Sequence, residues 1–196
     1  MNALELRPGN LAHLLLVLAL AGCSSAREGL RTAETSEYAA GTPGPPTRFE
    51  TVSPVTAGEL HDVVRDSEAR VVLVNVWATW CQPCLEEFPD LLRIEREYRG
   101  RGVKLILVSG DFDTEVPNVV KFLSRQGVDF PTYIKAGSDM EFINTMNSEW
   151  SGALPATFVY DGGGHLARFW EGKASYAVLE QAVLEVLQKR DGGMPQ

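Results

Sequence analysis

The chain has 196 residues, of which 44% are hydrophobic, and this is enough apolar sequence for one compact domain with tails. Its 26 acidic residues outnumber its 18 lysines and arginines, so the formal net charge is −8. That charge argues against electrostatic binding to nucleic acid or to anionic lipid headgroups, and we expect no nucleic-acid partner.

The N-terminus carries the features of an export signal. Arg7 precedes an apolar run from Leu11 to Ala21, which is too short to cross a bilayer as a helix. A basic residue before such a run is typical of a secretory signal peptide, which we place at residues 1–22. The run ends in Leu20-Ala21-Gly22-Cys23, which looks like a bacterial lipobox. We therefore expect Cys23 to be lipidated; an ordinary signal peptide that happens to contain a cysteine is the alternative.

The cysteine count agrees with lipidation. The chain has three cysteines, and a thioether at Cys23 would leave Cys81 and Cys84 as a single pair. From Ser24 to about Arg48 the chain is rich in Ser, Thr, Gly, Pro and Ala and shows no helical or strand periodicity. We expect residues 23–48 to be a lipidated N-terminus and flexible linker, followed by a domain at 49–190 and a tail at 191–196.

The first half of the domain alternates helical and strand patterns. Glu59 to Val64 has a short helical pattern, and Val71 to Trp77 is a continuous apolar run typical of a strand buried on both faces. Apolar residues recur at helical spacing from Pro83 to about Tyr98, where Pro89 is expected to cause a kink. Val103 to Val108 predicts a second buried strand.

The alternation continues beyond this strand. Pro117 predicts the first turn of a helix that ends at Gly127, with Asp111, Asp113 and Thr114 as candidate caps. A further strand and helix are expected between Phe130 and Asn147.

The last elements predict a hairpin and a helix. Thr157–Tyr160 and Leu166–Trp170 flank Asp161-Gly162-Gly163-Gly164, which is a turn signal. An amphipathic helix follows from about Ser175 to Lys189. The whole order predicts an α/β fold with a mixed sheet.

The strongest chemical signal is the segment Trp77-Ala78-Thr79-Trp80-Cys81-Gln82-Pro83-Cys84. A buried strand leads to the first cysteine, and the second lies in the first turn of the next helix. Free backbone N–H groups and the helix dipole stabilise a thiolate there, and would lower the thiol pKa of Cys81 from about 8.5 to about 7. We predict Cys81 as the exposed nucleophile and Cys84 as the resolving thiol.

Other uses of a Cys-x-x-Cys pair fit this chain poorly. After the signal peptide is removed, the remaining histidines are His61 and His165, so thiols and imidazoles cannot complete a four-ligand zinc site. Leu85 follows Cys84, which excludes haem attachment through Cys-x-x-Cys-His. Peroxidase chemistry of the peroxiredoxin kind would need a threonine where the chain has Ala78. Thiol-disulfide exchange remains, and we expect it to use no metal or cofactor.

Three segments carry a resemblance to a known family, namely Asn75–Cys84, Glu87–Pro89 and Gly152–Phe158. They resemble the thioredoxin superfamily and, within it, the membrane-tethered, extracytoplasmic TlpA/ResA-type branch. The resemblance runs from about Val55 to Leu187. It implies a thioredoxin fold, with a central mixed β-sheet flanked by helices and an extra strand-helix unit in the middle.

The resemblance also implies a substrate surface. Pro155 is expected to be cis and to pack against a Cys81–Cys84 disulfide, although only about 5–6% of X–Pro bonds in folded proteins are cis. The backbone of Leu154 would then be free to pair with a substrate strand. Trp80 beside Cys81 is expected to cover the site and offer a partner an apolar platform, with core packing as the alternative.

Glu87 is a candidate acid-base residue. It lies three residues after Cys84 on the same helix face, and the resemblance places a glutamate at this position. A carboxylate there would raise the thiol pKa or accept a proton during resolution. A solvated residue, as expected for Glu86, is the alternative. Asn75 stands where thioredoxin proper has a buried aspartate and cannot relay a proton, which favours Glu87.

These features predict a lipid-anchored thiol-disulfide oxidoreductase in a bacterial cell envelope, with its domain facing the periplasm or extracytoplasmic space. We expect it to reduce disulfide-containing client proteins, because Gln82-Pro83 lacks a thiolate-stabilising histidine while Glu86 and Glu87 add negative charge. The resemblance implies clients such as apocytochrome c or copper-delivery proteins, and a membrane-embedded thiol protein as electron donor. The alternatives are a periplasmic disulfide oxidase or isomerase and a copper-binding module.

Overall fold

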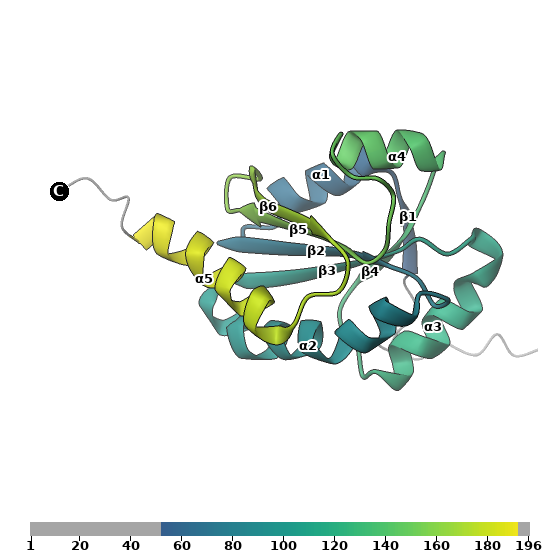
Figure 1. Ribbon diagram of the computed structural model, residues 1–196, viewed down its shortest axis with the longest axis horizontal. Coiled ribbons are helices and arrows are strands. Elements are labelled where there is room, and N and C mark those ends of the chain that lie inside the picture. Colours follow the sequence, from purple (N-terminus) through teal and green to yellow (C-terminus); the bar gives the residue numbers. More distant parts are fainter. Residues whose placement is uncertain (1–51, 192–196) are drawn as a thin grey trace, which may run out of the picture. The chain divides into compact units, whose positions relative to one another are not determined.

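The computed structural model describes residues 52–191, which form a six-stranded β-sheet between two layers of helices (Figure 1). The predicted signal peptide at 1–22, the lipidation site Cys23 and the linker up to residue 48 lie outside the described residues. None of the helices in residues 52–191 has the length and apolar character that a membrane span requires.

The sheet is mixed, as the sequence predicts, and its strands lie in the order β1-β4-β3-β2-β5-β6. The strand bounds are Val52–Val55 for β1, Val71–Trp77 for β2, Val103–Ser109 for β3, Thr132–Lys135 for β4, Ala156–Asp161 for β5 and Leu166–Glu171 for β6. The pairs β1–β4, β4–β3 and β3–β2 are parallel, whereas β5 is antiparallel to both β2 and β6.

Strand β2 delivers the chain to the cysteine pair. All of its residues are buried, and its four valines favour the extended backbone of a strand covered on both faces. Its register pairs Trp77 with Ser109 of β3 and Val76 with Ala156 of β5. One end of the sheet therefore brings together three segments: the one that follows β2, the one that follows β3 and the one that precedes β5.

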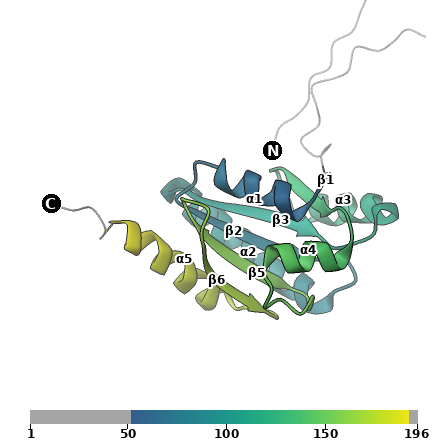
Figure 2. The same cartoon turned by 90° about the horizontal axis from the view of Figure 1, so that it is seen from above.

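Helices cover both faces of the sheet. Figures 1 and 2 show α2 (Gln82–Tyr98), α3 (Val116–Arg125) and α5 (Tyr176–Asp191) on one face, and α1 (Ala57–Arg65) and α4 (Asp139–Met146) on the other. Two short 3-10 helices, η1 (Arg99–Arg101) and η2 (Asp113–Glu115), follow α2 and precede α3. Each face has its own apolar core; the first includes Phe88, Leu91, Ile94, Leu179 and Val183, and the second includes Leu60, Val64, Phe142 and Trp150.

Most elements form where the sequence pattern predicts them. The helix expected from Pro83 begins at Gln82 and continues as one helix through Pro89. The predicted turn lies between β5 and β6, where Asp161 Oδ1 accepts hydrogen bonds from the backbone N–H groups of Gly163 and His165. The side chain of Asp161 therefore organises the turn, as aspartate often does.

The predicted capping of α3 is wrong. Its N-cap residue is Glu115, which makes no side-chain capping hydrogen bond, and Asp113 and Thr114 belong to η2. Asp111 cannot cap α3 because its carboxylate is bonded to Thr79 instead. Pro117 does occupy the first turn of the helix, where its missing N–H costs little.

Strand β1 is an element that the sequence pattern does not predict. It is short and contains Pro54, which is tolerated because β1 lies at an edge of the sheet. Its parallel pairing with β4 matches Val52 with Thr132 and Val55 with Lys135. Since β1 is short and pairs with β4 alone, this pairing is what distinguishes it from a loop.

Candidate active site

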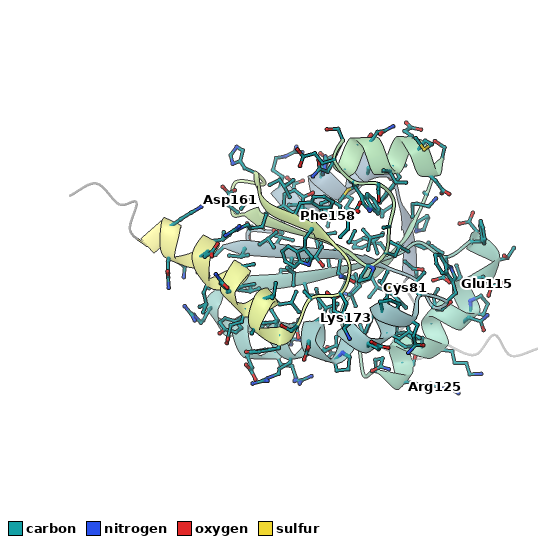
Figure 3. All side chains as sticks on the ribbon, in the orientation of Figure 1. Cys81, Glu115, Arg125, Phe158, Asp161 and Lys173 are labelled. Carbon is teal, nitrogen blue, oxygen red and sulfur yellow. A yellow bond between two sulfur atoms is a disulfide. The ribbon has the colours of Figure 1, made fainter. Side chains whose placement is uncertain are left out.

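The two cysteines form a disulfide at the start of α2. Cys81 is the N-cap residue of this helix, and Cys84 lies in its first turn, with 5.3 Å between the two Cα atoms. The backbone N–H of Cys84 donates a hydrogen bond to Cys81 Sγ at 3.3 Å. Figure 3 shows Cys81 at this end of α2. The first sulfur thus occupies the positive end of the helix, where a thiolate would be stabilised.

The expected exposure of Cys81 is not found in this disulfide form. Cys81 is 5% exposed and Cys84 is 1% exposed, and both belong to the apolar core on the α2 side of the sheet. The reason is that β2 is buried up to its last residue, so the next turn starts inside the core. Cys81 remains the more accessible of the two, which agrees with its predicted role as the attacking sulfur.

Trp80 stands beside the disulfide as a protruding aromatic residue. Its side chain is 68% exposed, so it does not pack in the core, whereas Trp77 is buried as expected. It borders a groove of about 730 Å³ together with Phe112, which is 78% exposed and lies in the loop after β3. Phe112 is a candidate partner contact that sequence reasoning missed. An aromatic residue between two aspartates, Asp111 and Asp113, is the signal that could have indicated it.

The peptide bond between Leu154 and Pro155 is cis, as the resemblance implies. Pro155 is buried and directly precedes β5, and Ala156 pairs with Val76 near the end of β2. The Leu154–Pro155 segment therefore lies at the same end of the sheet as the loop that leads to Cys81. The backbone carbonyl of Pro155 accepts a hydrogen bond from the N–H of Gly172 at 2.8 Å.

Glu87 is fully buried and belongs to a polar cluster inside the core. Asn75 Nδ2 donates to Thr157 Oγ1 at 3.0 Å and to Glu87 Oε1 at 3.5 Å, and Oε2 of Glu87 has no hydrogen-bond partner among the described residues. Burial raises the pKa of the Glu87 carboxyl to about 7, and the charge of Asp90 adds to the effect. Polar groups of Ala174 and Thr157 lower the pKa of Glu87 and offset part of this rise. Glu87 is therefore no solvated helix residue.

Glu86 behaves as the solvated neighbour that the sequence predicts. It is exposed, and its Oε2 lies 2.8 Å from Nζ of Lys173. The hydrogen bond with Lys173 holds the pKa of the Glu86 carboxyl below its usual value. Glu86 and Glu87 thus differ strongly in environment although they are adjacent in the sequence, because they point to different sides of α2.

The loop before the disulfide is held by a residue with an unpredicted role. Asp111 is buried, and its carboxylate accepts hydrogen bonds from the backbone N–H and the hydroxyl of Thr79. The serine at the end of β3, Ser109, donates to the same carboxylate. The pattern Ser-x-Asp directly after a buried strand is the signal that could have indicated it.

Comparison with known proteins assigns the chain to a family. The model of the AhpC/TSA family matches residues 54–169, which include both cysteines, Glu87 and Pro155. The chain belongs to the AhpC/TSA family. The matched region runs from β1 into β6 and thus contains all of the site described above.

Curated relatives of this AhpC/TSA-family protein include two proteins named thiol-disulfide oxidoreductase ResA. The protein of Bacillus thuringiensis (strain Al Hakam) is 30% identical over 117 residues, and that of Bacillus subtilis (strain 168) is 26% identical over 115 residues. The matches cover 60% and 58% of this chain and 64% and 60% of those relatives, so the chain spans less than two thirds of their length.

A solved structure supports the thioredoxin fold. The crystal structure of a thioredoxin-family thiol:disulfide interchange protein from Chlorobium tepidum TLS has a TM-score of 0.53 and 27% sequence identity. The similarity covers 62% of this chain and 83% of that one. The predicted thioredoxin fold and the predicted likeness to ResA-type proteins are confirmed.

Proposed function

We propose that this AhpC/TSA-family protein is a thiol-disulfide oxidoreductase that reduces disulfides of client proteins through Cys81 and Cys84. The observation that carries the proposal is the disulfide between these residues at the N-terminus of α2. This geometry provides both a stabilised thiolate and a second sulfur within reach of it. The names of the ResA relatives and of the Chlorobium tepidum structure support the same chemistry.

The exchange proceeds in two displacement steps. The Cys81 thiolate attacks one sulfur of the client disulfide, forms a mixed disulfide and releases the other client sulfur as a thiolate. Cys84 then loses its proton and attacks Cys81 Sγ, so the mixed disulfide breaks and the second client thiolate leaves. The client gains two electrons, and the Cys81–Cys84 disulfide of the present structure is the oxidised product.

Glu87 supports the second step in this proposal. A buried carboxyl with a pKa of about 7 is poised to accept the Cys84 proton near neutral pH. Asn75 is a hydrogen-bond donor to Glu87 and does not itself take the proton. The three-residue offset on α2 places the two side chains on the same helix face.

Trp80, Leu154 and Pro155 form the client-binding surface in this proposal. Trp80 offers an exposed apolar face beside the disulfide, and the Leu154–Pro155 segment lies at the same end of the sheet. A client strand that pairs with the backbone of Leu154 would bring its disulfide to Cys81. Main-chain pairing of this kind gives affinity without demanding one client sequence.

We further propose that the protein acts in the bacterial cell envelope, anchored through lipid on Cys23 and facing the periplasm or extracytoplasmic space. The export signal and lipobox-like ending support this placement. Clients would be proteins such as apocytochrome c or copper-delivery proteins, and a membrane-embedded thiol protein would supply the electrons.

The direction of exchange follows from the reduction potential. A buried acid on the helix that carries both cysteines disfavours the thiolate and therefore favours reducing behaviour. We expect a potential near the reducing end of the range, around −270 mV, when the pair is equilibrated in thiol buffers. A value near −120 mV would instead identify a disulfide oxidase. Tight copper binding by the reduced protein without insulin reduction would favour the copper-binding alternative.

The proposed roles of the two cysteines are tested by trapping. Cys84→Ala should accumulate mixed disulfides with clients, because the attacking sulfur is present and the resolving sulfur is missing. Cys81→Ala should trap none and should fail to reduce insulin. Non-reducing gels of cells that express each variant give the answer. The reverse pattern would show that Cys84 attacks first.

A further inference from the structure

Asp111 lies behind the loop that leads to Cys81, and the exchange mechanism above does not use it. Its Oδ2 accepts hydrogen bonds from the Thr79 backbone N–H at 2.9 Å and from the Ser109 hydroxyl at 2.6 Å. Its Oδ1 accepts a hydrogen bond from the Thr79 hydroxyl at 2.5 Å, and its own N–H donates to Ser109 Oγ at 3.0 Å. We call Thr79, Ser109 and Asp111 the loop clamp.

The loop clamp continues the pairing of β2 with β3 beyond the ends of the strands. Trp77 pairs with Ser109, and the Trp77 carbonyl accepts the N–H of Gly110 at 2.7 Å. In a parallel ladder, the N–H two residues further along, that of Thr79, would next donate to the carbonyl of Gly110, the residue that follows β3. It donates to the Asp111 carboxylate instead. A side chain therefore ends the ladder and determines where the chain leaves the sheet.

The position of Thr79 determines the geometry at Cys81. The backbone N–H of Cys81 donates to the carbonyl of Ala78 at 3.2 Å, so residues 78–81 form one turn between the clamp and the helix. Cys81 then has φ −88° and ψ 98° as N-cap residue, with Sγ accepting the N–H of Cys84. If Thr79 moved, this turn and the orientation of Sγ at the helix terminus would move with it.

We propose that Asp111 is a positioning residue for thiol-disulfide exchange, which holds Cys81 at the N-terminus of α2 through Thr79. The inference rests on the proposed function and adds a residue to it. Asp111 acts through its three accepted hydrogen bonds and takes no part in proton or electron transfer. A buried carboxylate that only stabilised the fold would change the free energy of unfolding but leave the reactivity of Cys81 in the folded protein unaltered.

The test measures alkylation of Cys81 by iodoacetamide in the reduced full-length protein from pH 5 to 10, with fragment mass spectrometry to separate Cys81 from Cys84. Thr79→Val removes the hydroxyl bond to Asp111 without changing charge, and it should slow alkylation at pH 6 by about threefold, because the thiol pKa rises. Thr79→Ser keeps the hydroxyl and should restore the wild-type rate. Asp111→Asn should slow alkylation further, by about tenfold.

Asp113→Asn is the matched control, because it removes the same charge from an exposed residue two positions further along, at the start of η2. It should alkylate like the wild type. Unchanged rates in folded Thr79→Val and Asp111→Asn would overturn the proposal. Faster alkylation in Asp111→Asn with no change in Thr79→Val would also overturn it, since Asp111 would then act only through its charge.

The alkylation experiment gives an answer even if one variant does not fold or the protein does not reduce insulin. If Asp111→Asn fails to fold, the comparison of Thr79→Val with Thr79→Ser decides alone, since both variants keep the Asp111 side chain and change the half-buried Thr79 by a single group. Alkylation needs no client, so its result is independent of whether the wild-type protein reduces insulin. Failure of insulin reduction would contradict the proposed function, whereas unchanged alkylation would contradict only the positioning role.

Discussion

At the scale of single residues, the candidate site contains a buried acid, Glu87, that has few hydrogen-bond partners. Glu87 touches Asn75 through one oxygen, and its other oxygen has no hydrogen-bond partner among residues 52–191. Such an environment disfavours the charged form, which explains why the carboxyl pKa rises to about 7. The Glu87 carboxyl therefore titrates close to the pH at which thiol-disulfide exchange would take place.

Replacing Glu87 should change the redox potential. Glu87→Gln removes a negative charge near the cysteine pair, which stabilises the thiolate and shifts the potential toward oxidising values. A change of one pKa unit corresponds to about 30 mV if it acts wholly on the reduced form. The shift should be larger at pH 8 than at pH 6, because Glu87 is ionised only above about pH 7. Titration in glutathione buffers at both pH values measures it.

Glu86→Gln is the control for this experiment. Glu86 is exposed and paired with Lys173, so its removal should leave the potential close to that of the wild type. Equal potentials for the wild type and both variants would mean that Glu87 does not act on the cysteines.

The raised pKa also predicts how stability depends on pH. Between about pH 4.5 and pH 7 the folded protein keeps the Glu87 proton that the unfolded chain releases, so stability falls as pH rises and the loss is complete above the folded pKa. The loss from this one group is on the order of 2–3 kcal/mol. Urea unfolding of oxidised wild type and Glu87→Gln at pH 4.5 and pH 8 measures it. Glu87→Gln should lack this decrease in the free energy of unfolding. If the free energies of wild type and variant changed in parallel with pH, the raised pKa of Glu87 would be contradicted.

At the scale of elements, the site is assembled where strand ends and a helix start come together. β2 brings in the cysteines, the segment after β3 brings in Asp111, and the segment before β5 brings in cis-Pro155. α2 adds the dipole and Glu87. Elements on the other face of the sheet, such as α1, support the fold without touching the cysteine pair, so stability and redox chemistry should be separable.

Helix α1 offers a test of this separation. Thr56 forms a capping box with Glu59, in which each side chain bonds the backbone N–H of the other residue. Thr56→Ala should lower the free energy of unfolding by about 1 kcal/mol. The reduction potential of the Cys81–Cys84 pair in Thr56→Ala should equal that of the wild type. Thr114→Ala changes an exposed threonine that caps no helix and should leave both quantities unaltered; a shifted potential in Thr56→Ala would show that α1 is coupled to the site.

At the scale of the whole molecule, the proposed membrane attachment would depend on acyl groups and not on charge. The net charge of −8 makes attraction to anionic lipids unfavourable. Lipid attachment contributes about 0.8 kcal/mol for each buried CH₂ group, which is enough to hold the protein at a bilayer when more than one chain is present. The proposed linker would then let the redox domain meet its partners beside the membrane.

Lipidation makes a direct prediction. Wild-type protein should incorporate labelled fatty acid in cells and sediment with membranes, whereas Cys23→Ser should do neither, because the acceptor sulfur is gone. Equal absence of label from both proteins would contradict the lipoprotein proposal. Cys81→Ser serves as the control, since it also removes a thiol but should keep the label.

The sequence by itself determined the parts of this protein that depend on local pattern. The continuous apolar run of β2, the helical spacing of α2 and the glycine-rich turn before β6 each specify an element through residues that are close in the chain. The pair Cys81 and Cys84 is equally local, and it indicated the chemistry. The cis bond before Pro155 needed the family resemblance, since a proline alone favours trans.

Only the tertiary structure decided the environment of these residues. The carboxylate of Asp111 lies 32 residues from Thr79 in sequence, and Asn75 and Thr157 are 82 residues apart, so no local pattern reveals their hydrogen bonds. The burial of Cys81 and Glu87 likewise depends on which elements pack over them. Thiol reactivity and carboxyl pKa follow from desolvation and from hydrogen bonds across the sheet, which exist only once distant segments have been brought together.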